Sequence, residues 1–126
     1  MRCLGIDYGR VWIGVAFSEG FQANSLFQVH RNEALLRIGD VVQKQEIDKI
    51  VIGISDGFLK KDILEFGEKL TNAYAVQVVY FDETLTSHQA QGLVRQSGGR
   101  NKKKTTKEHQ VAAALILEQY LDTQRL

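Results

Sequence analysis

Short extended segments rich in branched and aromatic residues recur along this chain of 126 residues and alternate with amphipathic ones. Such segments predict strands, and we place them at residues 2–6, 13–17, 25–30, 49–54 and 76–81. The segment 49–54 is apolar almost throughout, which is typical of a central strand buried on both faces. Gly9 follows the first segment and predicts a tight turn before the second, because glycine adopts turn conformations at the least cost.

Apolar residues at helical spacing follow the third strand, from Ala34 to Val42, and Asn32 is the expected cap of this helix. Three further helices are predicted. One spans 59–75, and one spans 86–97, where residues 86–89 fit a capping box that opens it. The last follows a capping box formed by Thr105 and Glu108. The order of elements predicts an α/β fold with two strand–helix–strand crossovers.

The last of these helices differs from the others in its pattern. Its residues are apolar almost all round from Val111 to Leu117. A helix with apolar residues on every side is normally buried, so we expect this one to be deeply packed.

Length and composition indicate one domain over residues 1–126, because 44% of the residues are hydrophobic and the chain is long enough to form a core. The single Cys3 cannot form an internal disulfide, and the amino terminus lacks the pattern of a signal peptide, so a cytoplasmic protein is expected. Membrane insertion is excluded, because no apolar stretch approaches the roughly 20 residues that a membrane helix needs.

Charge is distributed unevenly behind a net value of +1. Residues 98–107 carry five Lys or Arg and no acid, which leaves 11 bases and 15 acids in the rest of the chain. A basic segment on an acidic body favours contact with nucleic-acid phosphates over simple solvation, although solvation remains an alternative. The candidate phosphate-binding residues are Arg10, Arg100, Lys102, Lys103, Lys104 and Lys107.

Two acidic positions come where apolar strands end. Asp7 closes the first strand, and Asp82 and Glu83 close the fifth. If these strands were neighbours, Asp7 and Glu83 could share a Mg²⁺ or Mn²⁺ ion at the edge of the sheet where α/β proteins bind ligands. Such an ion would activate water toward a phosphodiester. For either residue alone, a turn or a solvated strand end is the alternative.

His109 is the third candidate, in the first turn of the last predicted helix. The helix dipole disfavours the imidazolium there, so this side chain could act as a metal ligand or a general base. A surface histidine near the cap is the alternative. Tyr8 and Trp12 could stack on an unpaired base near this site, or could instead cover the end of the hairpin.

Several segments, taken together and in order, resemble the YqgF/RuvX family of pre-16S rRNA nuclease and Holliday-junction resolvase-like proteins. They are Leu4–Gly9 with Ile13–Ser18, Val51–Ile54, Asp82–Ser87, and Val111–Leu117 with Tyr120–Asp122. The resemblance implies a ribonuclease H-like fold: a five-stranded mixed sheet, with the first three strands antiparallel, flanked by helices.

The chain also departs from the family pattern. Val11 and Trp12 stand where a Lys-Arg pair is usual, Ser55 replaces a proline and Thr84 replaces an arginine. His109 stands where the resemblance implies a third metal-binding aspartate. The site would then carry one negative charge fewer, and Mn²⁺ would suit it better than the harder Mg²⁺.

Our hypothesis from the sequence is a metal-dependent endonuclease that acts on structured nucleic acid and processes the 5′ end of pre-16S rRNA. Asp7, Glu83 and His109 are its expected catalytic and metal-binding residues, with Mg²⁺ or Mn²⁺ as cofactor. The alternatives are a Holliday-junction resolvase acting on branched DNA and a non-catalytic nucleic-acid-binding protein. Nucleotide binding of the actin-like type is disfavoured, because it needs two such domains. A homodimer and association with ribosomal precursor particles are further expectations.

Overall fold

The computed structural model describes residues 1–82 and 107–124. Five strands form one sheet in the order β3-β2-β1-β4-β5. They are β1 (Cys3–Tyr8), β2 (Trp12–Ser18), β3 (Ala23–His30), β4 (Lys49–Ile54) and β5 (Gln77–Asp82). β1, β2 and β3 are antiparallel neighbours, whereas β1, β4 and β5 run parallel. The prediction of a five-stranded mixed sheet whose first three strands are antiparallel is confirmed.

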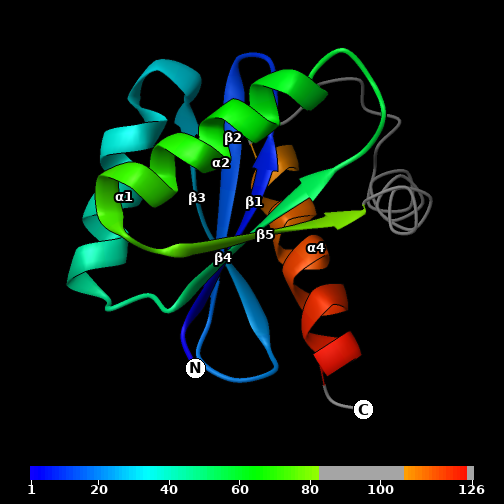
Figure 1. The fold of residues 1–126 in the computed structure, drawn as a ribbon. Coiled ribbons are helices and arrows are strands. Elements are labelled where there is room, and N and C mark those ends of the chain that lie inside the picture. Colours follow the sequence, from blue (N-terminus) through cyan, green and yellow to red (C-terminus); the bar gives the residue numbers. More distant parts are fainter. Residues whose placement is uncertain (83–106, 125–126) are drawn as a thin grey trace.

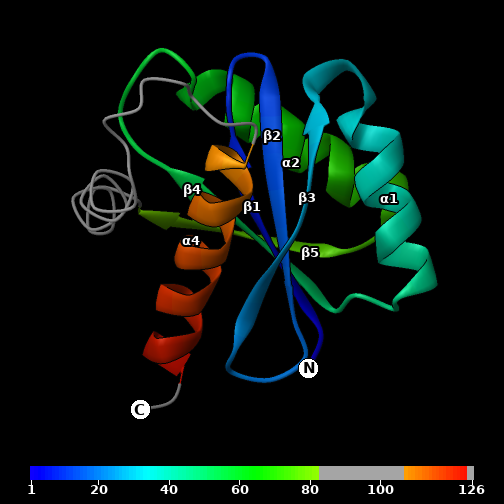
Figure 2. The same cartoon turned by 180° about the vertical axis from the view of Figure 1, so that it is seen from behind.

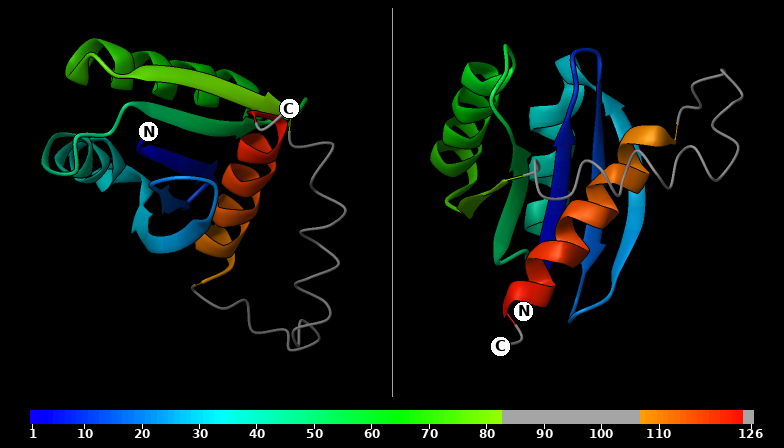
Figure 3. Two further views of the ribbon diagram at one scale, coloured as in Figure 1. Left: turned by 90° about the horizontal axis from the view of Figure 1, so that it is seen from below. Right: turned by 90° about the vertical axis from the view of Figure 1, so that its right-hand side faces the viewer.

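Helices cover both faces of this sheet (Figures 1 and 2). α1 (Ala34–Lys44) and α2 (Lys60–Tyr74) lie on one face, and α4 (Glu108–Gln124) lies on the other. The edge-on view in Figure 3 shows the three layers. Both predicted crossovers are present, since α1 links β3 to β4 and α2 links β4 to β5. The helix predicted over 86–97 lies outside the described residues.

The sheet separates two apolar clusters. The larger lies under α1 and α2 and contains Leu4, Ile6, Ile50 and Ile52 of the central strands. The smaller lies under α4 and is built from Cys3, Ala16, Val51, Ala113, Ile116, Leu117 and Leu121. The last helix is deeply packed as expected on the side of α4 that faces the sheet, whereas Val111 is 40% exposed.

Glycines let α4 approach the sheet very closely. A Cβ added to Gly5 of β1 would lie 2.6 Å from Cβ of Leu117 and 2.8 Å from the carbonyl oxygen of Ala113. One added to Gly14 of β2 would overlap the backbone of His109. The first turn of α4 therefore rests directly on β2, with no side chain between.

Three local predictions were wrong. Asp7 does not follow β1 but lies within it, because it pairs with Gly14 and so extends the hairpin. Asn32 does not cap a helix: His30 accepts a hydrogen bond from the Asn32 N–H and starts a short 3₁₀ turn (Arg31–Glu33) that precedes α1. Glu108 is the first residue of α4 rather than the third of a capping box, and Thr105 lies outside the described residues.

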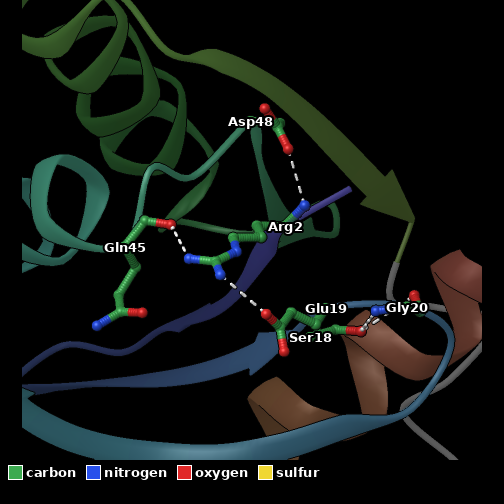
Figure 4. A network of polar contacts seen from close by, with 6 residues as sticks. All are labelled: Arg2, Ser18, Glu19, Gly20, Gln45 and Asp48. Atoms are coloured by element: carbon green, nitrogen blue, oxygen red, sulfur yellow. Dashed lines mark hydrogen bonds and ion pairs between the residues drawn. The ribbon is translucent and has the colours of Figure 1, made fainter.

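The amino end of β1 is tied to its surroundings by the network drawn in Figure 4. The Arg2 N–H donates to Asp48, and the Arg2 guanidinium donates to the carbonyl of Gln45 and pairs with Glu19 at 3.0 Å. Nearby, the Ser18 hydroxyl bonds both backbone groups of Gly20. These contacts join the start of β1, the end of β2 and the segment before β4.

No helix in the two described ranges is both long enough and apolar enough to cross a membrane.

Replacing Gly14 with alanine should destabilise the protein by roughly 3 kcal/mol, because the new methyl group collides with the rigid backbone of α4. Urea unfolding measures the change. Gly20→Ala is the matched control, since nothing lies within 4 Å of its added Cβ, and it should change stability by no more than about 0.5 kcal/mol. Equal stability of the two variants would contradict the close packing of α4.

Candidate active site

The carboxyl ends of the three parallel strands meet at one edge of the sheet, where α4 also begins (Figures 1 and 2). The register aligns Ile6 with Ile52 and Ile52 with Tyr80. One residue further along each strand, Asp7, Gly53 and Phe81 are therefore level with one another. Such an edge is where open α/β sheets place ligands.

Asp7 and His109 meet at this edge. Nδ1 of His109 lies 2.6 Å from Oδ2 of Asp7, and both side chains are partly shielded from solvent, with 33% and 16% of their surfaces exposed respectively. A carboxylate only accepts hydrogen bonds, so Nδ1 carries the shared proton. In the neutral ring, Nε2 then keeps its lone pair.

Contacts with β3 hold the first turn of α4 in place. The His109 N–H, one of the donors that a helix start leaves without an intrahelical partner, donates to Oε1 of Gln28 at 3.2 Å. The Ser25 hydroxyl donates to the carbonyl of Gln110 at 3.1 Å. Gly9 makes room for the ring, because a Cβ there would lie 2.7 Å from Cε1 of His109. These contacts set both the position and the orientation of the imidazole.

Arg31 connects the turn after Asp7 to α2. Its guanidinium donates to the carbonyl of Arg10 at 3.3 Å, pairs with Asp62 at 3.1 Å and lies over the ring of Tyr8. Burial raises the pKa of the Tyr8 phenol, and the positive charge of Arg31 partly opposes that rise. Arg31 thereby steadies the backbone on the far side of Asp7 from His109.

The sequence did not point to Arg31, Gln28 or Ser25. Alternation along β3 offers a weak signal for Gln28, because polar residues of a strand that share one face can reach the helix packed on that face. Recognising it requires knowing that α4 covers β3.

Of the predicted catalytic residues, Asp7 and His109 are brought together, whereas Glu83 lies outside the described residues. Asp82, the last residue of β5, is exposed. It alternates with Phe81, which contacts Tyr120 of α4, so Asp82 belongs to the opposite face from Asp7.

Strand order decides whether the first and fifth strands are neighbours. β1 and β5 are not neighbours, because β4 lies between them. Two strand spacings of about 4.8 Å separate them, which is roughly 10 Å. Gly53 stands level with Asp7 on the intervening strand, so β4 itself contributes no side chain at that level.

Among the predicted phosphate-binding residues, Arg10 is exposed in the turn between β1 and β2, and Lys107 directly precedes α4. Four others, namely Arg100, Lys102, Lys103 and Lys104, lie outside the described residues.

The two candidate stacking residues have different surroundings. Tyr8 is buried against Phe66, with Arg31 over its ring, and cannot receive a base. Trp12 remains 41% exposed and makes an edge contact with His30. Tyr8 is therefore part of the apolar core under α2.

Within the described part of the chain, no group of three His, Cys, Asp or Glu side chains could hold a metal ion. Asp7 and His109 supply one carboxylate and one imidazole.

A scan against protein families gives a match to the family RuvX, described as Holliday junction resolvase, over residues 1–123. The chain belongs to this family. Two similar proteins bear the name "Putative pre-16S rRNA nuclease". The RuvX chain is 34% identical to the one from Syntrophus aciditrophicus, over 97% of its own length and 89% of the relative's. It is 35% identical to the one from Caldanaerobacter subterraneus subsp. tengcongensis, over 99% of both chains.

Solved structures give the same fold for this RuvX chain at low sequence identity. RuvC of Thermus thermophilus in complex with a Holliday junction matches with a TM-score of 0.63 and 12% identity, over 99% of this chain and 96% of that one. The Holliday junction resolvase of fowlpox virus matches with a TM-score of 0.61 and 10% identity, over the whole of both chains. These likenesses confirm the ribonuclease H-like fold.

The Asp7–His109 contact predicts which ring nitrogen of His109 carries the proton. At a pH where the imidazole is neutral, Nδ1 should be protonated and Nε2 should not, because the Asp7 carboxylate accepts from Nδ1. Long-range ¹H–¹⁵N correlation spectra of the ring distinguish the two forms. His30, whose Nδ1 accepts from the Asn32 N–H, is the internal control and should show the opposite tautomer. A proton on Nε2 of His109 would contradict the hydrogen bond.

Proposed function

We propose that this protein is a metal-dependent endonuclease that cleaves phosphodiester bonds in structured nucleic acid, with 5′-end processing of pre-16S rRNA as its main role. The supporting observation is the 2.6 Å contact between Asp7 and His109 at the carboxyl edge of the sheet. Membership of a family of nucleases and resolvases supports the reaction class. The names of the full-length relatives favour pre-16S rRNA as the substrate.

The chemistry of the donor set fits a divalent cation. His109 contacts Oδ2 of Asp7, so the other carboxylate oxygen is available to an ion. Glu83 is our proposed second carboxylate: it follows Asp82 directly in the sequence, and Asp82 faces away from Asp7. Two carboxylates suit Mg²⁺ or Mn²⁺, and an imidazole ligand would favour Mn²⁺. Such an ion would lower the pKa of a bound water and stabilise charge on the leaving oxygen.

The two roles proposed for His109 both use Nε2, because Nδ1 is engaged by Asp7. Our preferred role is proton transfer: Nε2 accepts the proton of the attacking water, and Asp7 holds the ring and stabilises the imidazolium that forms. The second role is direct coordination of the ion through Nε2, with Asp7 fixing the ring from behind. In both roles, the carboxylate of Asp7 orients the ring of His109.

Nucleic-acid contacts would extend from this edge in two directions. Arg10 stands in the turn three residues after Asp7, and Lys107 lies just before α4. We propose that these cations, together with the basic segment that ends at Lys107, bind phosphates without reading bases. A cytoplasmic location, binding to ribosomal precursor particles and a homodimer belong to the same proposal.

Cleavage should require Asp7 and a divalent cation. The purified protein is expected to cut a 5′-extended pre-16S rRNA fragment with Mg²⁺ or Mn²⁺ and to stop when EDTA is added. Asp7→Asn should lower the rate by at least about a hundredfold while the protein remains folded, as urea unfolding shows, because the Asn oxygen can still accept from Nδ1 of His109. Asp40→Asn on α1, where Asp40 pairs with Lys44 at the surface, is the matched control and should cut normally.

A four-way DNA junction in the same assay tests the resolvase alternative, to which the family's description points. Preferential cutting of the junction would identify branched DNA, and not rRNA, as the substrate. Binding that weakens steeply with salt, with no product under either ion, would support the non-catalytic alternative. Cleavage that survives Asp7→Asn would end the proposal for this site.

His109 variants separate its two roles. If Nε2 accepts a proton, His109→Ala should slow cleavage by about a hundredfold or more, and added imidazole should partly restore it. If His109 is instead a ligand in the place of a carboxylate, His109→Asp should raise cleavage with Mg²⁺ above that of the unaltered protein. Unchanged cleavage by both variants would remove His109 from the site.

A further inference from the structure

An exposed aromatic side chain stands at the same edge of the sheet as Asp7 and His109. Phe58 lies in the loop between β4 and α2, and 73% of its surface is exposed. The guanidinium of Arg10, from the turn between β1 and β2, lies over its ring at 4.5 Å from the centroid. Both segments follow strands that end at this edge (Figure 1). The pair therefore belongs to the surroundings of the candidate active site.

Phe58 also lines an open groove of about 920 Å³. The groove is bordered by the loop before α2, by the outer side of α2 and by β5, and it includes Lys60, Lys61, Leu64 and Tyr80. Its volume is in the range that binds small organic groups. The ring of Phe58 thus contacts a cation and also borders a space large enough for a base.

Charge varies along this groove. Lys60 and Lys61 stand close to Phe58 at the start of α2, whereas Glu65 and Glu68 lie one and two turns further along the helix. Asp56 pairs with Lys60, but its side chain is almost fully exposed, so the pair is weak in water. The end next to the candidate active site is therefore cationic and aromatic, and the far end is acidic. This polarity favours a polyanion that enters at the carboxyl edge.

We propose that Phe58 and Arg10 bind an unpaired base of the nucleic-acid substrate, with Lys60 and Lys61 contacting its phosphates. This inference rests on the proposed nuclease function and specifies its substrate: a strand that is single-stranded beside the scissile bond. An exposed ring can stack only on a base that has left its duplex, and such stacking does not depend on sequence.

The position of the pair also limits where the unpaired base lies. Arg10 is three residues after Asp7, so the backbone between them spans at most about 11 Å. The stacked base therefore belongs to the part of the substrate near the phosphodiester at Asp7.

The test uses the Asp7→Asn protein, which should bind without cutting, and fluorescence anisotropy with two RNA hairpins. One hairpin is blunt, and the other carries a short single-stranded extension that contains 2-aminopurine. Phe58→Ala in this background should weaken binding of the extended hairpin about tenfold and leave the blunt one unchanged. It should also abolish the quenching of 2-aminopurine, whereas Phe58→Trp should keep both binding and quenching.

Leu36→Ala is the matched control, because Leu36 is another highly exposed apolar residue but lies on α1. It should bind both hairpins normally. Equal binding of the extended hairpin by the Phe58→Ala and parent proteins would overturn the inference. The groove would then be a candidate binding site for a protein partner. An equal loss for both hairpins would also overturn it, since Phe58 would then contact duplex. If the parent binds neither hairpin, the proposed function itself fails.

Discussion

The close approach of α4 to β1 and β2 is the constraint on which the rest of the structure depends. Only glycine fits at positions 5 and 14, because the helix backbone occupies the space of a side chain there. Side chains of β3 then fix the first turn of the helix through Gln28 and Ser25. Because the start of the helix is fixed in position and direction, the ring of His109 lies against Asp7. The candidate site is thus a consequence of how the helix packs on the sheet.

The two edges of the sheet are built differently. At the amino edge, Arg2 and Asp48 bind neighbouring segments through backbone groups as well as side chains. Exposed ion pairs alone contribute little, but hydrogen bonds to backbone groups hold specific segments together. At the carboxyl edge, Arg31 holds the turn after Asp7 by donating a hydrogen bond to the carbonyl of Arg10 and pairing with Asp62. The exposed groups of that edge, Arg10 and Phe58 among them, are carried by loops anchored in this way.

Most of the fold could be predicted from the sequence because most strands, unlike β3, are compact apolar runs between turn residues. Helix boundaries were less predictable. α2 ends at Tyr74 because Ala75 adopts the left-handed conformation, with φ of 53°, that glycine usually supplies, and nothing in the sequence signals it. At the start of α1, the side chain of His30 did what Asn32 was expected to do. At both positions an uncommon residue takes the capping role, and at the start of α1 this made the expected cap wrong.

The candidate site was also predictable in part, from where its residues lie in the predicted strands and helices. Asp7 and His109 could be paired because a strand end and a helix start are the positions that α/β folds use for ligands. An apolar pattern does not say which strands are neighbours, so it left open whether β4 lies between β1 and β5. Gln28, Ser25 and Arg31 were missed because polar residues on a strand or after it indicate a partner only once the packed helix is known.

An imidazole at position 109 changes what the architecture requires of an ion. A carboxylate placed where His109 stands would face that of Asp7 at hydrogen-bonding distance, and two like charges so close are stable only with a shared proton or a cation. The imidazole donates a hydrogen bond to Asp7 instead, so attraction replaces repulsion. The first turn of α4 can therefore dock on β1 without metal. We infer that in this chain the ion is needed for the proposed chemistry and not for the fold.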